Sequence, residues 1–381
     1  MHPSRPRHRI TTLTFGLILL LTTRTATVPA HAETNLPADP AQTLEALRKK
    51  YDLPAMAVVV LKDGKICDRA ATGVRKAGSP VPVTTNDVFH IGSCTKPMTA
   101  TLAAILIEEG KLRWDTTIAK IFLELKGRMH PQYETVTVEQ LLQNRGGVPS
   151  EPPAAAWKRA WEENGSVAAQ RQEFITAILT APPEAAPGTK MIYSNQGYTI
   201  VGAMLEKATG QTWEALITEK LFRPLHMDSA GFGPLGNQAE INQPWGHRKM
   251  GLLINADRVD NPPAIGPAGR VHCTLTDLAQ FAQLHLAGEK PGQLLKPETF
   301  RRLHQPPAQG DYAGGWIVQD RKWAGGKILM HDGSNTRWYV VMWLAPEKDF
   351  AVIVGSNCMG EGVAKAVDEV ASTMIKKWLP Q

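Results

Sequence analysis

The 381-residue sequence has only four cysteines and, after its first residues, no long apolar stretch. Four cysteines are too few for a small disulfide scaffold. With 43% hydrophobic and 20% charged residues, the chain is neither disordered nor collagen-like. It contains no internal repeat and no low-complexity segment. The composition therefore predicts a globular protein, and because a single core stops growing near ~250–300 residues, we expect two packed lobes.

Several widespread functional motifs are also missing. The chain has no G-x-S-x-G nucleophile elbow, no H-E-x-x-H zinc motif and no phosphate-binding loop. The string from Gly231 to Gly236 matches the dinucleotide pattern G-x-G-x-x-G, but no apolar strand precedes it and Pro234 stands where a helix should begin. The cysteines form no C-x-x-C pair and no zinc pattern, so we expect free, buried thiols, with two disulfides as the alternative.

The net charge of +6 is unevenly distributed along the chain. Four of the 42 basic residues and none of the 36 acidic residues lie in residues 1–32, which leaves 38 basic against 36 acidic residues in the rest. Binding to DNA or RNA needs clustered lysine and arginine on a strongly basic domain. We therefore expect no nucleic-acid partner.

Residues 1–32 have the pattern of an export signal. A basic stretch from Arg5 to Arg9 precedes an uncharged run from Ile10 to Thr23, and Ala30-His31-Ala32 supplies small residues for a cleavage site. The run of 14 residues is shorter than the ~18–20 needed to span a bilayer. We predict cleavage before Glu33, a periplasmic or secreted protein and no stable membrane anchor; an uncleaved anchor is the alternative.

The order of the expected elements indicates a sheet assembled from both ends of the chain. Helices are expected over 41–51, 274–287 and 362–378 and through most of 95–205; strands are expected over 55–61, 65–71, 316–318, 327–330, 339–344 and 350–355. Lys62-Asp63-Gly64 is typical of a hairpin between the first two strands. We predict an α+β fold (α/β sandwich) over 33–381: an antiparallel sheet from about 33–92 and 310–381, flanked by helices, with a mainly helical lobe inserted at about 93–309.

The candidate active site begins with Ser93 and Lys96, the only S-x-x-K in the chain. Pro97 is tolerated only in the first turn of a helix, which we expect to run from Met98 to Glu109. The spacing puts both side chains on one face, where the lysine leans back toward the serine hydroxyl. To activate the serine as a base, Lys96 must lower its pKa from about 10.4 toward roughly 7–8, which needs burial or a second partner. The alternative is an ordinary helix start with a solvated lysine.

Two later motifs would complete this site. Tyr193-Ser194-Asn195 is the only Y-x-N in the chain and lies in a predicted loop before an apolar helix. A phenol beside Lys96 would share its proton, and the Asn195 amide can donate and accept hydrogen bonds when an acyl group is positioned. Alternatively, Tyr193 is a half-buried aromatic residue whose hydroxyl caps a helix. His331-Asp332-Gly333-Ser334 ends a predicted C-terminal strand, so its backbone would line the site opposite the helix.

In this order, Ser93-x-x-Lys96, Tyr193-Ser194-Asn195 and His331-Asp332-Gly333 resemble the motifs of serine β-lactamase-like hydrolases: class C β-lactamases, DD-carboxypeptidases and related esterases. The resemblance includes 138–142 and 267–270 and spans nearly the whole mature chain. It implies the β-lactamase/transpeptidase-like fold and no metal or organic cofactor. It also implies the following roles: Ser93 as nucleophile, Lys96 with Tyr193 as general acid and base, Asn195, His331, Gly333 and Ser334 as substrate-binding residues, and the N–H groups of Ser93 and Ser334 as the oxyanion hole.

The third motif departs from the Lys-Thr-Gly or Lys-Ser-Gly usual in β-lactamases. An ionised Asp332 facing the pocket would repel a substrate carboxylate, so penicillins and cephalosporins would be poor substrates unless Arg337 compensates or Asp332 points away. We expect an exported serine hydrolase acting on a small molecule or short peptide: an ester, a D-amino-acid peptide or a β-lactam. The alternative is a non-catalytic penicillin-recognising module. The sequence leaves the oligomeric state open.

Overall fold

The computed structural model describes residues 39–237, 239–288, 290 and 294–380. The chain divides into two units, Met1–Asn35 and Leu36–Gln381, and all described residues belong to the second. The predicted export signal over 1–32 and its cleavage site therefore lie outside the described residues.

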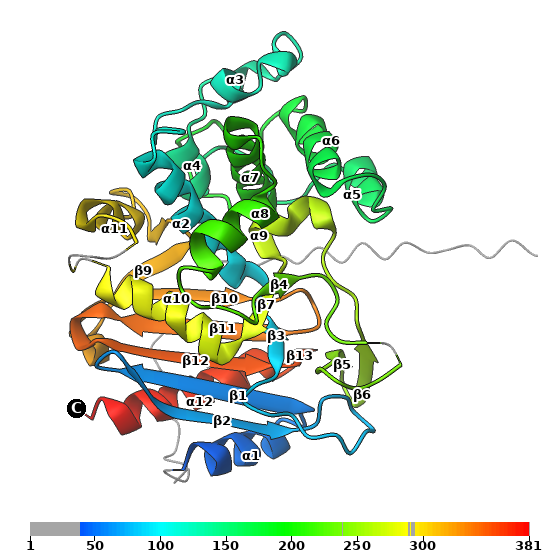
Figure 1. Cartoon of the computed structure of the whole chain (residues 1–381), viewed down its shortest axis with the longest axis vertical. Coiled ribbons are helices and arrows are strands. Elements are labelled where there is room, and N and C mark those ends of the chain that lie inside the picture. The colour runs from blue at the N-terminus through cyan, green and yellow to red at the C-terminus, as the bar shows by residue number, and fades with distance from the viewer. Residues whose placement is uncertain (1–38, 238, 289, 291–293, 381) are drawn as a thin grey trace, which may run out of the picture. The chain divides into compact units, whose positions relative to one another are not determined.

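A seven-stranded antiparallel sheet forms one half of the second unit (Figure 1). Its strands are β1 (Ala55–Lys62), β2 (Lys65–Gly73), β8 (Tyr312–Ala313), β9 (Trp316–Arg321), β10 (Gly326–Gly333), β11 (Tyr339–Ala345) and β12 (Phe350–Ser356). Their spatial order is β2-β1-β12-β11-β10-β9-β8, and Val58 of β1 lies opposite Val354 of β12. The predicted sheet built from both ends of the chain is confirmed.

Helices cover both faces of this sheet because its central strands are apolar on both sides. On one face, α1 (Pro40–Lys50) and α12 (Val363–Trp378) enclose an apolar core that includes Leu47, Val352 and Val370. On the other face, α10 (Leu275–Ala287) packs on β1, β11 and β12. Thus α10, which falls in the range predicted for the helical lobe, packs against the sheet.

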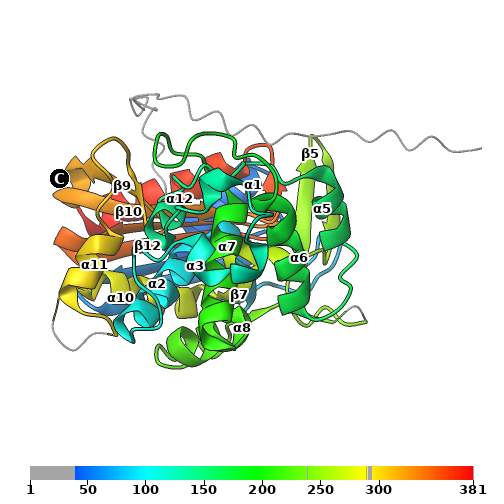
Figure 2. The same ribbon diagram turned by 90° about the horizontal axis from the view of Figure 1, so that it is seen from above.

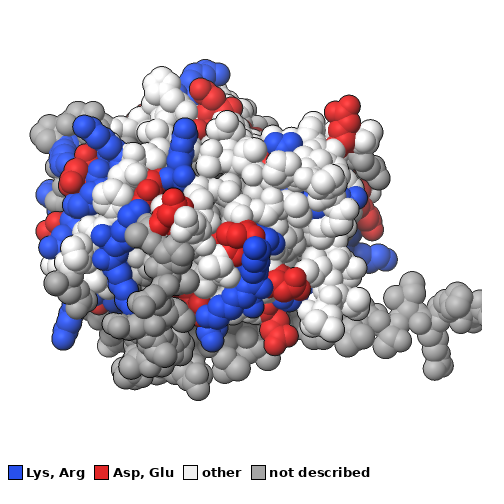
Figure 3. Space-filling model, turned by 90° about the horizontal axis from the view of Figure 1, so that it is seen from below, with Lys and Arg blue, Asp and Glu red and all other residues white. Residues whose placement is uncertain are grey.

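The outer side of α1 and α12 carries ion pairs rather than a single sign of charge. Lys50 lies 2.8 Å from Glu369, and Lys377 lies 2.6 Å from Asp68. Viewed from below, basic and acidic side chains are interspersed on the visible described surface (Figure 3).

The other half of the unit is mainly helical. Its helices are α2 (Thr95–Glu108), α3 (Ile118–Ile121), α4 (Val138–Leu142), α5 (Ala154–Ala160), α6 (Val167–Leu179), α7 (Asn195–Thr209), α8 (Trp213–Ile217), α9 (Gly266–Gly269) and α11 (Pro297–Leu303). The long helices α2 and α7 contact each other, and most of their residues are buried. Figure 2 shows this helical half from above. Arg171 of α6 is fully buried and forms ion pairs with Glu206 and Glu214. The predicted α+β fold is confirmed.

The unit also contains two small three-stranded sheets. One contains β3 (Val88–His90), β7 (Val271–Thr274) and β4 (Gly231–Phe232); the other contains β13 (Cys358–Gly360), β5 (Gly246–Met250) and β6 (Leu253–Asp257). The four cysteines are free, and all except the half-buried Cys67 are buried, as expected. Within the described part of the chain, no helix has both the length and the apolarity needed to cross a bilayer.

Candidate active site

Ser93 lies in a tight turn between β3 and α2. A single 3₁₀ turn, Gly92–Cys94, leads directly into α2. The helix starts at Thr95, earlier than the predicted Met98, and Pro97 is its third residue, where an intrahelical N–H bond is not needed. The Nζ of Lys96 donates to Ser93 Oγ at 2.8 Å. The structure therefore brings the predicted hydroxyl and amine into direct contact.

Lys96 is buried and has a full set of hydrogen-bond partners. Besides Ser93, its Nζ donates to Asn195 Oδ1 at 2.7 Å and to the carbonyl oxygen of Ala268 at 2.9 Å. Burial disfavours the ammonium and lowers the Lys96 pKa from 10.5 to about 7, although nearby Cys94 and Asp332 act in the opposite direction. Near neutral pH, much of Lys96 is therefore uncharged and able to take the proton of Ser93.

Tyr193 lies beside this pair. The Nζ of Lys96 is 4.7 Å from the centre of its ring, and Ser93 is close enough to influence the pKa of its phenol. Burial, and next the neighbouring Tyr312, raise the Tyr193 pKa well above 10.0, while the polar interaction with Ser93 opposes them. The phenol consequently keeps its proton at neutral pH, so it is suited to donate a proton or a hydrogen bond between Lys96 and Ser93.

Asn195 is the first residue of α7. The side chain of Ser194 caps this helix by accepting from the Gly197 N–H at 3.2 Å, which places the following side chain at the site. We predicted that Asn195 contacts substrate. In the structure its Oδ1 is occupied by Lys96, so its visible contact is with the candidate base.

His331 and Asp332 lie on opposite faces of β10, because successive strand residues alternate. His331 packs near Tyr193 and Tyr312, with ring centres 6.3 Å and 6.1 Å away. Asp332 lies opposite Val341 of β11, which belongs, like Tyr339, to the core beneath α1 and α12. Asp332 thus points away from the site, and the predicted repulsion of a substrate carboxylate does not arise from it.

The third motif supplies no free positive charge either. Burial, together with the nearby charge of Lys96, lowers the His331 pKa to about 3, although the carbonyl of Gly315 that accepts from Nδ1 opposes this. His331 is therefore neutral at pH 7. The guanidinium of Arg337 is bound to Asp257.

The turn at Ser93 crosses the end of β10 at two glycines. Gly92 has φ +51°, and a Cβ added there would lie 2.3 Å from the amide nitrogen of Ser334. A Cβ on Gly333 would lie 2.6 Å from the amide nitrogen of Ser93. Side chains cannot fit at either position, so this close crossing requires glycine. It places both amides of the predicted oxyanion hole next to each other.

Two contributions to the site were not predicted from the sequence. Tyr312 of β8 lies edge-on to Tyr193, with ring centres 6.2 Å apart, and its hydroxyl donates to that of Tyr198 at 3.5 Å. No local pattern marks Tyr312. The carbonyl of Ala268 also binds Lys96; it belongs to the 267–270 segment that carries part of the family resemblance. Among the described residues, no group of three or more His, Cys, Asp or Glu is placed to hold a metal ion.

A sheet packed against a helical lobe, with a serine and lysine between them, defines the penicillin-binding and β-lactamase class of folds. The Beta-lactamase family profile matches residues 40–373, and the chain belongs to this family. Penicillin-binding protein 4 of Amycolatopsis lactamdurans is 27% identical over 332 residues, covering 80% of this chain and 81% of that protein. Protein flp of Staphylococcus aureus is 22% identical, covering 86% of this chain, which spans 64% of its length.

Solved structures show the same fold. The octameric penicillin-binding protein homologue from Pyrococcus abyssi superposes with a TM-score of 0.72 at 22% identity, over 90% of this chain and 78% of that one. SurE superposes with a TM-score of 0.71 at 23% identity, over 88% of this chain and 73% of that one. At these identities the likeness establishes the fold alone.

Proposed function

We propose that this protein is a serine hydrolase that cleaves ester or amide bonds through an acyl-enzyme on Ser93. The observation that carries the proposal is the direct bond from Lys96, buried and with a pKa of about 7, to Ser93 Oγ. An ordinary solvated lysine would be charged near neutral pH and unable to accept a proton. Family membership supports the same class of chemistry.

The proposed reaction begins with transfer of the Ser93 proton to neutral Lys96. Ser93 Oγ then attacks the substrate carbonyl, and the resulting oxyanion is stabilised by the N–H groups of Ser93 and Ser334. The proton passes from Lys96, by way of the Tyr193 hydroxyl, to the leaving oxygen or nitrogen, and the bond to that atom breaks. In the second half of the reaction, water gives a proton to the Lys96–Tyr193 pair and attacks the acyl carbon. The proton then returns to Ser93 Oγ as the bond between Ser93 and the acyl group breaks, which releases the acid.

We propose that neutral acyl groups are preferred to substrates that carry a carboxylate. A carboxylate is bound most strongly by a cation with matching donors. His331 is neutral and Arg337 is already bound to Asp257. Poor binding of a substrate carboxylate is thus expected for a different reason from the one inferred from the sequence. The third motif and Arg337 offer no free cation to bind the carboxylate, whereas Asp332 does not repel it. A small ester or short peptide is the proposed partner.

The test is a kcat/KM panel of short acyl esters, D-amino-acid peptides, penicillins and cephalosporins, with Ser93→Ala as the matched control. We expect ester turnover that exceeds β-lactam turnover and disappears in the control. Efficient cephalosporin turnover with esters ignored would overturn the substrate preference. Absence of both substrate turnover and a covalent adduct on Ser93 would overturn the proposal that the protein is a serine hydrolase. A persistent stoichiometric adduct without product would instead identify a penicillin-recognising module.

We further propose that the mature protein begins at Glu33 and is periplasmic or secreted, without a stable membrane anchor. The basic, apolar and small-residue pattern of 1–32 supports this. Fractionation of expressing cells followed by N-terminal sequencing is the test. Recovery of the protein in the cytoplasm with its first 32 residues intact would contradict the proposal.

A further inference from the structure

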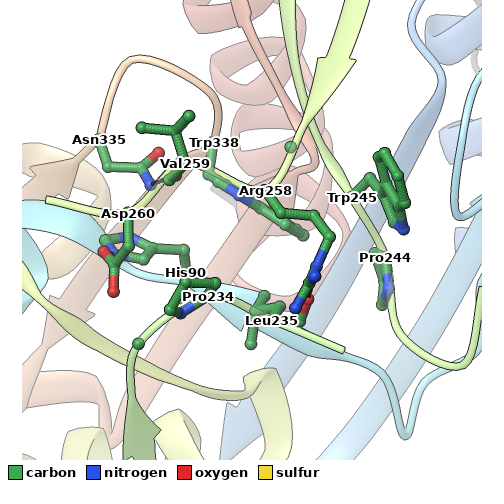
Figure 4. A pocket seen from close by; sticks show the side chains of 12 residues that line it. His90, Pro234, Leu235, Pro244, Trp245, Arg258, Val259, Asp260, Asn335 and Trp338 are labelled. Atoms are coloured by element: carbon green, nitrogen blue, oxygen red, sulfur yellow. Dashed lines mark hydrogen bonds and ion pairs between the residues drawn. The ribbon is translucent and has the colours of Figure 1, made fainter. Parts of the chain in front are cut away.

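His90 connects the Ser93 turn to a segment distant in sequence. The Gly92 N–H donates to His90 Nδ1 at 3.0 Å, so the ring must carry its proton on Nε2. Nε2 then donates to Asp260 Oδ1 at 2.7 Å. Both side chains are buried, with 2% of His90 and 8% of Asp260 exposed, and Arg270 Nε lies 3.2 Å from the second carboxylate oxygen. Figure 4 shows His90 and Asp260 side by side in the wall of a small pocket.

The residues on either side of Asp260 bind two other parts of the site. Asn261 Nδ2 donates to the carbonyl of Gly269 at 2.6 Å, directly after the Ala268 carbonyl that accepts from Lys96. On the other side, the Val259 carbonyl accepts from Asn335 Nδ2 at 3.2 Å, and Asn335 directly follows Ser334. Asn335 lies beside Val259 in Figure 4. The segment 259–261 is therefore hydrogen-bonded to His90, which holds the Ser93 turn, to the residue after the lysine's acceptor Ala268, and to the residue after Ser334.

We propose that His90 and Asp260 are positioning residues that hold Ser93 in register with Lys96 and the oxyanion amides. The inference rests on the proposed function and adds two residues to its machinery. Gly92 adopts its left-handed φ of +51° without strain but is also free to adopt many other conformations, so contacts with its surroundings must fix the one that the turn needs. The hydrogen bond from Gly92 to His90 is one such contact. The charged acceptor Asp260 in turn fixes the orientation of the His90 ring through a strong hydrogen bond.

Two conservative variants separate the two bonds of His90. In His90→Asn, the side-chain amide occupies the place of Nδ1 and can still accept from Gly92, whereas in His90→Gln it reaches the place of Nε2 and can still bind Asp260. His247 provides a matched control: it is fully buried, its Nε2 accepts from the Ala77 N–H at 3.0 Å, and its Nδ1 donates to the Asn357 carbonyl at 2.7 Å. This histidine likewise joins two backbone segments but contacts none of the proposed catalytic groups.

The experiment measures kcat, KM and melting temperature for a short acyl ester, and the rate at which a fluorophosphonate labels Ser93. We expect His90→Gln to lower kcat and labelling by about 10- to 100-fold with little change in KM, in line with the roughly 100-fold that a 1 Å misplacement costs. His90→Asn should recover most of kcat. The control variants His247→Asn and His247→Gln should lower the melting temperature without changing kcat. If the His90 variants do not fold, the same measurements are made on Asp260→Asn, which preserves the size of the side chain and one acceptor oxygen. We expect this variant to lower kcat severalfold.

Wild-type kcat in folded His90→Gln and Asp260→Asn would overturn the positioning role. A loss of kcat matched by an equal loss in the His247 variants would also overturn it, because it would reflect stability alone. If the wild type neither hydrolyses esters nor is labelled at Ser93, the proposed function fails, and this inference fails with it. An active wild type with unaffected variants removes only the positioning role.

Discussion

The acid side of the pH–rate profile depends directly on the burial of Lys96. Moving its pKa from 10.5 to about 7 corresponds to about 5 kcal/mol of preference against the ammonium. If uncharged Lys96 is the base, kcat/KM follows the uncharged fraction of the free enzyme. Activity must therefore fall as pH drops through about 7, the folded-state pKa, and the loss is reversed when pH rises again.

The size of the effect separates a buried base from an ordinary lysine. With a pKa of about 7, the uncharged fraction rises from about 10% at pH 6 to about 90% at pH 8, so kcat/KM should rise roughly tenfold and then level off. With an ordinary pKa of about 10.4, it would rise about 100-fold over that interval and continue upward. Neither the His331 pKa of about 3 nor the Tyr193 pKa, well above 10.0, falls in this interval.

The assay is the initial rate of hydrolysis of a neutral ester between pH 5 and 9, with melting temperature followed at each pH to exclude unfolding. Lys96→Arg is the companion variant, because a guanidinium cannot be deprotonated in this range and should abolish turnover. A rate that continues to increase tenfold per pH unit up to pH 9 would refute the lowered pKa. A flat profile, or an active arginine variant, would refute the role of Lys96 as base.

Three further substitutions test other parts of the account. Gly333→Ala should lower kcat by about 10²–10³, the usual cost of one oxyanion donor, because its Cβ would press on the Ser93 amide. The control Gly326→Ala, in the same strand, should leave ester turnover unchanged, and equal rates in the two variants would contradict a role for the close approach of Gly333 to Ser93. Asp332→Asn should leave KM for a carboxylate-bearing penicillin unchanged, since this side chain lies on the opposite face; a clear improvement in KM would show otherwise. Arg171→Met should lower the free energy of unfolding by about 3–5 kcal/mol, because two carboxylates lose their buried partner, and urea unfolding that gives under ~1 kcal/mol would contradict this.

Much of the sheet could be predicted because its signals are local. The Asp63-Gly64 pair forms the expected hairpin turn, and both residues have positive φ, +52° and +73°. Alternating and continuous apolar runs marked the strands on either side and at the C-terminal end. Which strands become neighbours across nearly 300 residues follows from packing of the whole chain, so only the general arrangement could be inferred.

The candidate site was predictable where a motif has a local geometric meaning. Ser93 and Lys96 share a helix face, and Pro97 marks its first turn. The orientation of Asp332 was available by the same kind of argument, because it must face the side opposite to His331 on a strand. Contacts such as His90 with Asp260, which are 170 residues apart, have no local pattern. Nor does a backbone acceptor such as the carbonyl of Ala268, because any residue type would supply it.

The most direct test of the central claim is to trap the covalent intermediate. The protein is mixed with a short acyl ester, quenched in acid during turnover and analysed by peptide mass spectrometry. The account predicts the mass of one acyl group on the peptide that contains Ser93, formed within the time of one turnover and absent from Ser93→Ala. Hydrolysis without any adduct on Ser93, or an adduct on a different residue that disappears at the rate of turnover, would contradict it.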